Sequence, residues 1–263
     1  MKPLTIDEVH EVLLGIAKEF HRVCEENNIP YYMLGGTMLG AIRHKGFIPW
    51  DDDMDFGVER KYFSQLEELF NKQPSSPFRL RTLYNSKTII NDPSKLEDIR
   101  TLIIEPERAN INEDIGINID IFPLDITNGN KSFFSRNNLV HIIGLINTYR
   151  YCNLKTLNWW RKAVAVIFKF VFCPFDKFFL LNFARKHLIP NDGDCISNLY
   201  GFWGVRETIP QSIMGQPVKY EFEDTYFYGA EKYDDYLRSL YGDYMIIPHV
   251  NHCHFDVSNV FMK

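Results

Sequence analysis

Apolar residues recur at spacings of three and four near the start of the chain, which matches the 3.6-residue turn of an α-helix. We therefore predict an amphipathic helix with one apolar stripe, formed by Ile6, Val9, Leu13, Ile16, Phe20 and Val23. Thr5 and Glu8 have the spacing of a capping box at its start. Asn27, Asn28 and Pro30 predict its end.

A period of two follows this helix and predicts strands. Met54, Phe56 and Val58 alternate with Asp53, Asp55 and Gly57, as in a strand with one buried face. Further strands are predicted over the ranges 31–34, 78–83, 101–104 and 116–122, and a hairpin or extended arm over 219–228. Further helices are predicted over the ranges 37–44, 61–72 and 230–241.

The order of these elements predicts an α+β fold, in which a mixed sheet is flanked by helices and carries a helical insertion. We predict a core over residues 1–130 and a helical region, facing an acceptor or a membrane, over 131–198. A C-terminal mixed segment over 199–263 is expected to pack on the core.

Composition and charge exclude several classes of function and location. The net charge of −5 argues against nucleic-acid binding, which needs a basic surface. The five cysteines are scattered and form no C-x-x-C pair, so neither a disulfide framework nor a zinc ribbon is predicted. Together with the lack of an apolar leader, this favours a cytoplasmic location.

One apolar stretch, residues 163–181, allows two interpretations. Charged residues and Pro174 interrupt it, so its unbroken apolar run is too short to cross a bilayer. It is expected to form a buried helix pair. The alternative is a peripheral contact with the inner face of the membrane, favoured by its phenylalanines and by the flanking basic residues Arg161, Lys162, Arg185 and Lys186.

The chemistry concentrates in an acidic cluster, Asp51, Asp52, Asp53 and Asp55. In a strand, Asp53 and Asp55 lie on the same face, where their charges repel unless a cation lies between them. Mg2+ prefers such carboxylate ligands together with substrate phosphates. The alternative is a solvated acidic turn, which the period-two pattern disfavours.

A third carboxylate completes the metal clamp used in phosphoryl transfer. Asp120 is the candidate, because Asn118 and Asp120 lie on one face of a predicted strand and the neighbouring isoleucines on the other. A purely structural role for Asp120 is the alternative. Asp125, just after Pro123, is expected in a turn.

Gly35, Gly36 and Thr37 precede a predicted helix and are candidates for binding phosphate, since bare glycines let backbone N–H groups approach an anion. Arg43 is a further candidate, because a guanidinium binds two oxygens at once. His44 and Lys45 either add positive charge to this site or form a solvated turn.

The string GGTMLGAIRHKGFIPWDDDMD, followed by NIDIFPLD and YGDYMIIP, resembles the LicD family, to which fukutin is distantly similar. The resemblance covers the first half of the chain and the tail, and it implies a nucleotidyltransferase-type fold. It also implies that Asp53, Asp55 and Asp120 are catalytic and bind Mg2+ (or Mn2+). Gly35, Gly36 and Thr37, with Arg43, would then bind the phosphates of the donor.

The activity implied by the resemblance is transfer of phosphocholine from CDP-choline to a sugar of a surface glycan, which can be lipid-linked. The chain after Pro248 departs from the family, which leaves the roles of His249, His252 and His254 open. Alternatives are a strict nucleotidyltransferase acting on a protein or small molecule, and a non-catalytic binding module. The D-D-x-x-D motif of isoprenoid synthases also fits at Asp51, but it needs an all-helical fold.

Overall fold

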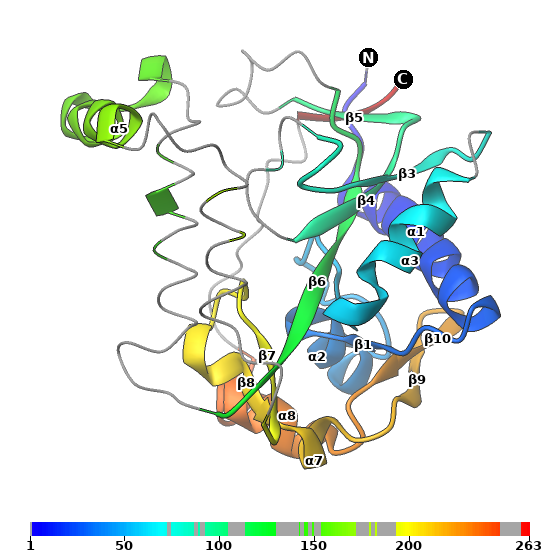
Figure 1. Cartoon of the computed structure of the whole chain (residues 1–263). Helices are drawn as coiled ribbons and strands as arrows, with labels where there is room; N and C mark the ends of the chain where they lie inside the picture. Colours follow the sequence, from blue (N-terminus) through cyan, green and yellow to red (C-terminus); the bar gives the residue numbers. More distant parts are fainter. Residues whose placement is uncertain are drawn as a thin grey trace.

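The computed structural model describes most of the predicted core and the C-terminal segment (Figure 1). The described ranges are 2–72, 75–86, 93–104, 114–129, 154–171, 193–247 and 259–263, with single positions at 89, 142, 145, 146, 149, 179 and 182. Helices and a mixed sheet alternate along them, so the predicted α+β class is confirmed. His249, His252, His254, Arg185 and Lys186 lie outside the described residues.

The main sheet is built around one long strand, β6 (Asn118–Thr127). It pairs in parallel with β2 on one side, and on the other side in antiparallel fashion with β4 and then β7. The remaining strands continue from these partners in the order β1-β2-β6-β4-β3, with β7 leading to β8. Their bounds are β1 (Tyr31–Met33), β2 (Asp55–Glu59), β3 (Phe78–Arg81), β4 (Ser94–Asp98), β7 (Cys195–Asn198) and β8 (Thr208–Pro210).

Strand β6 has the alternation that its sequence predicts, with Ile119 and Ile121 fully buried and Asp120 on the other face. It runs beyond the predicted end, so the expected turn at Asp125 is wrong. Asp125 lies inside the strand and forms an ion pair of 2.6 Å with Arg60. The strand tolerates Pro123 because pairing with β4 ends at Ile121 and pairing with β7 begins at Leu124, so no bond to either is lost.

Helix α1 (Ile6–Glu26) buries its predicted stripe against the sheet, where it contacts β4 and β6. The capping box is present, with the Glu8 amide donating to Thr5 Oγ1 at 3.2 Å and the Thr5 amide to Glu8 Oε2 at 2.7 Å. The predicted helix at 37–44 begins earlier, at Gly35. The other helices are α2 (Gly35–Arg43), η1 (Arg60–Tyr62), α3 (Phe63–Asn71), η4 (Gly204–Glu207), α7 (Gln211–Met214) and α8 (Tyr233–Tyr241).

Two small sheets complete the described fold. Strands β9 (Val218–Phe222) and β10 (Thr225–Gly229) form the predicted hairpin. Strands β5 (Thr101–Ile103) and β11 (Val260–Met262) pair near the N-terminus, where the Leu4 amide donates to the Val260 carbonyl at 2.9 Å. The two ends of the chain therefore lie side by side (Figure 1).

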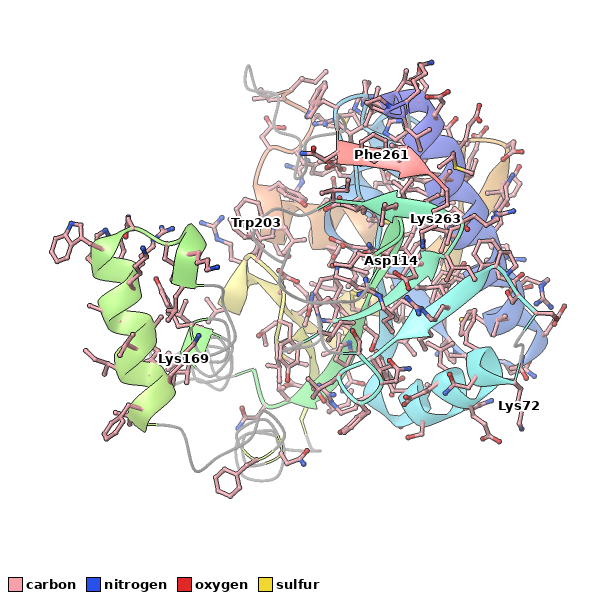
Figure 2. All side chains as sticks on the ribbon, turned by 90° about the horizontal axis from the view of Figure 1, so that it is seen from above. Lys72, Asp114, Lys169, Trp203, Phe261 and Lys263 are labelled. Atoms are coloured by element: carbon pink, nitrogen blue, oxygen red, sulfur yellow. The ribbon has the colours of Figure 1, made fainter. Side chains whose placement is uncertain are left out.

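Helix α5 (Trp159–Val171), which follows η3 (Leu154–Thr156), stands apart from the main sheet in both views (Figures 1 and 2). Ala165 is its one buried residue, and most of its large apolar side chains face solvent. The expected burial of the 163–181 stretch is therefore wrong for residues 163–171. Within the described chain, no helix is both long and apolar enough to cross a membrane.

Gly40 allows helix α2 to pack against the following turn. A Cβ built on Gly40 would lie 2.4 Å from the Gly46 carbonyl oxygen, whereas one on Gly15 in α1 meets nothing within 4 Å. We predict that Gly40→Ala lowers the free energy of unfolding by about 1–3 kcal/mol through overpacking. Gly15→Ala should raise it by about 0.5–1 kcal/mol through helix propensity. Urea denaturation of both variants measures this, and equal effects would contradict the close contact at Gly40.

Candidate functional site

Asp55 and Asp120 are brought together by the parallel pairing of β2 and β6, in which they are directly opposite each other. Side chains at such positions point to the same face of a sheet, with the strands roughly 4.8 Å apart. The Asp120 amide donates to the Met54 carbonyl at 2.9 Å, which fixes this register. The sequence-predicted pair is thus adjacent in space although 65 residues separate the two positions in the chain.

The two aspartates lie in a cleft of about 940 Å³, together with Asp51 and Asp53. Asp53 precedes β2 rather than lying in it, so it reaches the cleft from the connecting loop. Gly35, Gly36 and Arg43 also line this cleft, so the structure brings these predicted residues to one place. The remaining lining includes the aromatic residues Trp50, Phe122, Tyr200, Phe202, Trp203, Tyr241 and Tyr244.

Asp55 is surrounded by other carboxyl groups of the cleft. Burial raises the pKa of Asp55 well above its usual range, and the nearby carboxylates Asp53, Asp120 and Glu207 raise it further. The ammonium of Lys95 acts in the opposite direction. A carboxylate held in such surroundings is stabilised by any additional cation.

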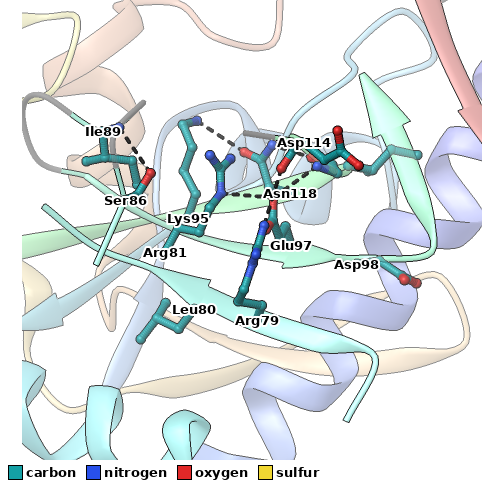
Figure 3. A network of polar contacts seen from close by, with 12 residues as sticks. Arg79, Leu80, Arg81, Ser86, Ile89, Lys95, Glu97, Asp98, Asp114 and Asn118 are labelled. Atoms are coloured by element: carbon teal, nitrogen blue, oxygen red, sulfur yellow. Dashed lines mark hydrogen bonds and ion pairs between the residues drawn. The ribbon is translucent and has the colours of Figure 1, made fainter. Parts of the chain in front are cut away.

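Lys95, a residue that sequence analysis did not single out, supplies positive charge on the Asp120 side of the cleft. It lies opposite Asp120 in the antiparallel β4–β6 pair, and its Nζ donates to the carboxylate of Asp120. The same Nζ donates to Asn118 Oδ1 at 3.1 Å (Figure 3). No motif marks Lys95, because strand β4 was not predicted. Among the described residues, no three acidic, histidine or cysteine side chains converge closely enough to form a metal site by themselves.

Strand β4 is itself anchored by a buried ion pair beside Lys95 (Figure 3). Glu97 and Arg81 are both fully buried and lie 2.9 Å apart, and Glu97 also accepts from the Gly116 amide at 2.9 Å and from Arg79 Nε at 2.6 Å. A buried carboxylate with this many donors is held in one position. The network therefore fixes the strand from which Lys95 reaches Asp120.

Gly35 and Gly36 are the first two residues of α2, and Gly35 lies close to the Asp55 carboxyl group. Gly35 has a φ of +46°, and its amide donates to the Tyr236 hydroxyl at 3.0 Å. A Cβ on Gly36 would lie 2.7 Å from Asp51 Oδ2, so glycine at this position lets the carboxylate approach the helix. Thr37 is buried below the cleft surface, where its Oγ1 accepts from the Asp55 amide at 2.8 Å. Its contacts thus position Asp55.

Arg43 is held at the rim of the cleft by backbone and side-chain contacts. Its Nη1 donates to the Tyr244 carbonyl and its Nε to His44 Nε2, each at 2.9 Å. Burial, and then the Arg43 charge, lower the pKa of His44, so the imidazole is neutral and accepts this bond. His44 therefore orients Arg43, and Lys45 is placed in the turn that follows with a φ of +62°.

A loop with aromatic side chains forms one wall of the cleft, and sequence analysis did not assign it. Trp203 packs edge-to-face on Phe202 and on Tyr241, with ring centroids 5.4 and 5.3 Å apart. Tyr241 remains protonated, because burial and the charge of Asp55 raise its pKa. The wall thus offers ring faces and a hydroxyl beside the acidic floor of the cleft.

Glu207 organises this aromatic loop. Its carboxylate accepts from Asn198 Nδ2 at 2.7 Å and from the Trp203 amide at 2.8 Å. A Cβ on Gly201 would lie 1.9 Å from Glu207 Oε2, so the loop backbone passes directly against the carboxylate. Burial raises the pKa of Glu207 to about 7, although the two hydrogen bonds lower it.

Comparison with known proteins connects this cleft to a family. A family model described as LicD/FKTN/FKRP, nucleotidyltransferase domain, matches residues 28–142. The lipopolysaccharide cholinephosphotransferase LicD of Haemophilus influenzae is 30% identical over 94% of this chain and 94% of its own length. The human ribitol 5-phosphate transferase FKRP is 33% identical over 70 residues, which cover 27% of this chain and 14% of its own length.

The raised pKa of Glu207 predicts a pH-dependent stability. The folded-state pKa of about 7 lies above the ordinary value of 4.5, so the folded protein binds the proton more tightly. The free energy of unfolding should therefore fall as the pH rises from about 4.5 to about 7, and should change little through this group above that. Glu207→Gln should remove this part of the dependence.

This pH dependence is measured by urea denaturation of the wild type, Glu207→Gln and Glu221→Gln between pH 4.5 and 8. Glu221 is exposed on β9, so its substitution should leave the pH profile unchanged. Parallel profiles for the wild type and Glu207→Gln would contradict a buried, proton-binding Glu207.

Proposed function

The chain belongs to the LicD family, and we propose that it transfers phosphocholine from CDP-choline to a sugar hydroxyl of a cell-surface glycan. The observation that supports this most strongly is the juxtaposition of Asp55 and Asp120 in a cleft that also contains bare glycines and an aromatic wall. The cholinephosphotransferase relative aligns over 94% of the chain, so the cleft residues fall within the similar part.

The carboxylate oxygens of this cleft suit Mg2+, or Mn2+, in chemical type, although no three such side chains of the described residues converge on one point. Asp53, Asp55 and Asp120 offer the oxygen ligands that such ions prefer, and a bound cation would offset the burial and the neighbouring carboxylates that raise the pKa of Asp55. When bound, the ion would neutralise the phosphate charge of the donor. Lys95, which contacts Asp120, would supply a second positive charge on this side of the cleft.

The donor phosphates would lie against Gly35 and Gly36, with Arg43 at their outer side. The acceptor hydroxyl oxygen attacks the headgroup-side phosphorus in line with the leaving group. One P–O bond forms to the sugar, the P–O bond to CMP breaks, and the hydroxyl proton passes to the Asp120 carboxylate. Thr37 contributes by holding the Asp55 backbone at 2.8 Å, rather than by touching phosphate.

The aromatic wall favours choline over a polyol headgroup. A quaternary ammonium group cannot donate hydrogen bonds and is recognised by ring faces and nearby negative charge. Trp203, Phe202 and Tyr241 provide the rings, and Asp243 and Glu207 line the same cleft. A polyol would instead need several polar partners for its hydroxyls. The wall therefore supports a CDP-choline donor.

A strict nucleotidyltransferase activity is the second candidate, favoured by the description of the matching family model. The two activities differ in which group leaves the donor. Transfer of phosphocholine releases CMP, whereas nucleotidyl transfer leaves a nucleotide on the acceptor.

We predict that Asp55→Asn and Asp120→Asn each lower turnover of CDP-choline with Mg2+ by about 100-fold or more, since each removes charge needed at the transferred phosphate. Asp224→Asn, on the exposed tip of the β9–β10 hairpin, should retain activity. Chromatography of CMP and of the acceptor product measures both. Full activity in either cleft variant contradicts the assignment, and a nucleotidylated acceptor supports the second candidate.

We further predict that Trp203→Leu raises the KM for CDP-choline by about 5- to 30-fold, as expected for a lost cation–π contact. The KM for the neutral isostere, in which a tert-butyl group replaces trimethylammonium, should change much less. Tyr84→Leu, an exposed aromatic substitution elsewhere, is the control. Equal shifts for both donors would show that Trp203 acts through shape alone.

A further inference from the structure

Helix α5 turns its apolar face to solvent. Six of its large hydrophobic side chains are exposed, and Trp159 and Phe170 are 81% and 83% exposed. They follow the helical spacing of three and four, so they share one side of the helix. This face consists of Trp159, Trp160, Val166, Ile167, Phe170 and Val171, with Ala163 between them.

The opposite side of the same helix contacts the protein. Ala165 is buried there, and Phe168 packs edge-to-face on Tyr149 with centroids 5.9 Å apart. A surface helix of a globular protein normally has the reverse arrangement, with its apolar stripe toward the core. The arrangement of α5 therefore leaves an apolar surface that needs another apolar phase or partner.

Lys162 lies at the edge of this face, and the helix contains no acidic residue. Arg161 reaches the face from the Ala165 side by contacting Trp160. Arg161 and Lys162 are exposed in its first turn, and the Arg161 guanidinium lies 5.2 Å from the ring centre of Trp160. The whole chain has a net charge of −5, so this basic border is a local feature. Tryptophan beside basic residues at the edge of an apolar face is typical of helices that lie in a membrane interface.

We infer that the exposed face of α5 docks onto the surface of a bilayer that contains anionic lipids. The apolar side chains enter the interface, and Arg161 and Lys162 contact the headgroups. A second copy of the chain is a poorer fit. Two α5 faces packed on each other about a two-fold axis would bring together borders that carry the same basic charge. This inference does not depend on the proposed transferase activity.

Sedimentation of the full chain with vesicles tests this docking. We expect binding at low salt to phosphatidylcholine vesicles that contain phosphatidylglycerol, and much less to phosphatidylcholine alone. Salt should release the protein, because the charge contribution is screened. Phe170→Ser should lower the partition coefficient about tenfold or more by removing the most exposed ring of α5. Lys162→Glu should lower it by a similar factor of about ten.

Two matched substitutions outside α5 control for the general effects of losing an exposed ring or reversing a charge. Tyr226→Ser removes an exposed aromatic ring from β10, and Lys232→Glu makes the same charge change at the start of α8. Both should bind vesicles as the wild type does. Absence of binding at low salt, or equal binding of all variants, overturns the inference. Analytical ultracentrifugation gives a further test. If the wild type forms a dimer that Phe170→Ser abolishes, and the wild type does not bind vesicles, the partner of this face is a second copy and the inference is wrong.

Discussion

The parallel pairing of β2 with β6 is the constraint on which the rest of the site depends. It places the Asp55 and Asp120 carboxylates side by side on one face of the sheet, where their charges repel. Backbone hydrogen bonds offset this cost. The Asp120 amide donates to the carbonyl of Met54, the residue before β2, and the Leu34 amide donates to the Asp55 carbonyl, each at 2.9 Å. The sheet therefore holds two like charges together in a position that favours a cation.

The protein compensates the negative charge of these two aspartates only in part. Lys95 contacts Asp120 from the opposite neighbouring strand, and the buried Arg81–Glu97 pair fixes the strand that carries it. Within the described part of the chain Asp55 forms no comparable ion pair, and its pKa is raised by burial and by neighbouring carboxylates. The cleft thus keeps one carboxylate paired and one short of positive charge, which suits a site that binds a cation together with an anionic donor.

Buried polar contacts also position the aromatic wall of the cleft. Glu207 binds both ends of the aromatic loop, from Asn198 to Trp203, and so presents ring faces above the acidic floor. Helix α5 shows the contrary case, because most of its large apolar side chains are exposed. The Glu207 contacts hold the aromatic loop in place at the cleft. The apolar face of α5 is instead exposed, which suits contact with an external apolar phase.

Local sequence patterns determined much of the fold and part of the site. The stripe and capping box of α1, the alternation of β2 and β6 and the β9–β10 hairpin follow from side-chain periods of 3.6 and 2, which act over a few residues. The Asp53–Asp55 cluster and the Gly35–Gly36 turn were visible for the same reason. The turn expected at Asp125 failed because β6 changes partners at Pro123, and no local pattern reports a change of partner.

Tertiary structure alone decided the remainder. Lys95 meets Asp120 across 25 positions of the chain, and Thr37 meets Asp55 across 18, because strand order and register bring them together. Trp203 and Glu207 reach the cleft from a segment whose sequence has no periodic signal of its own. The orientation of α5 was equally undetermined, since an apolar stripe specifies that a face avoids water but not whether protein or lipid covers it.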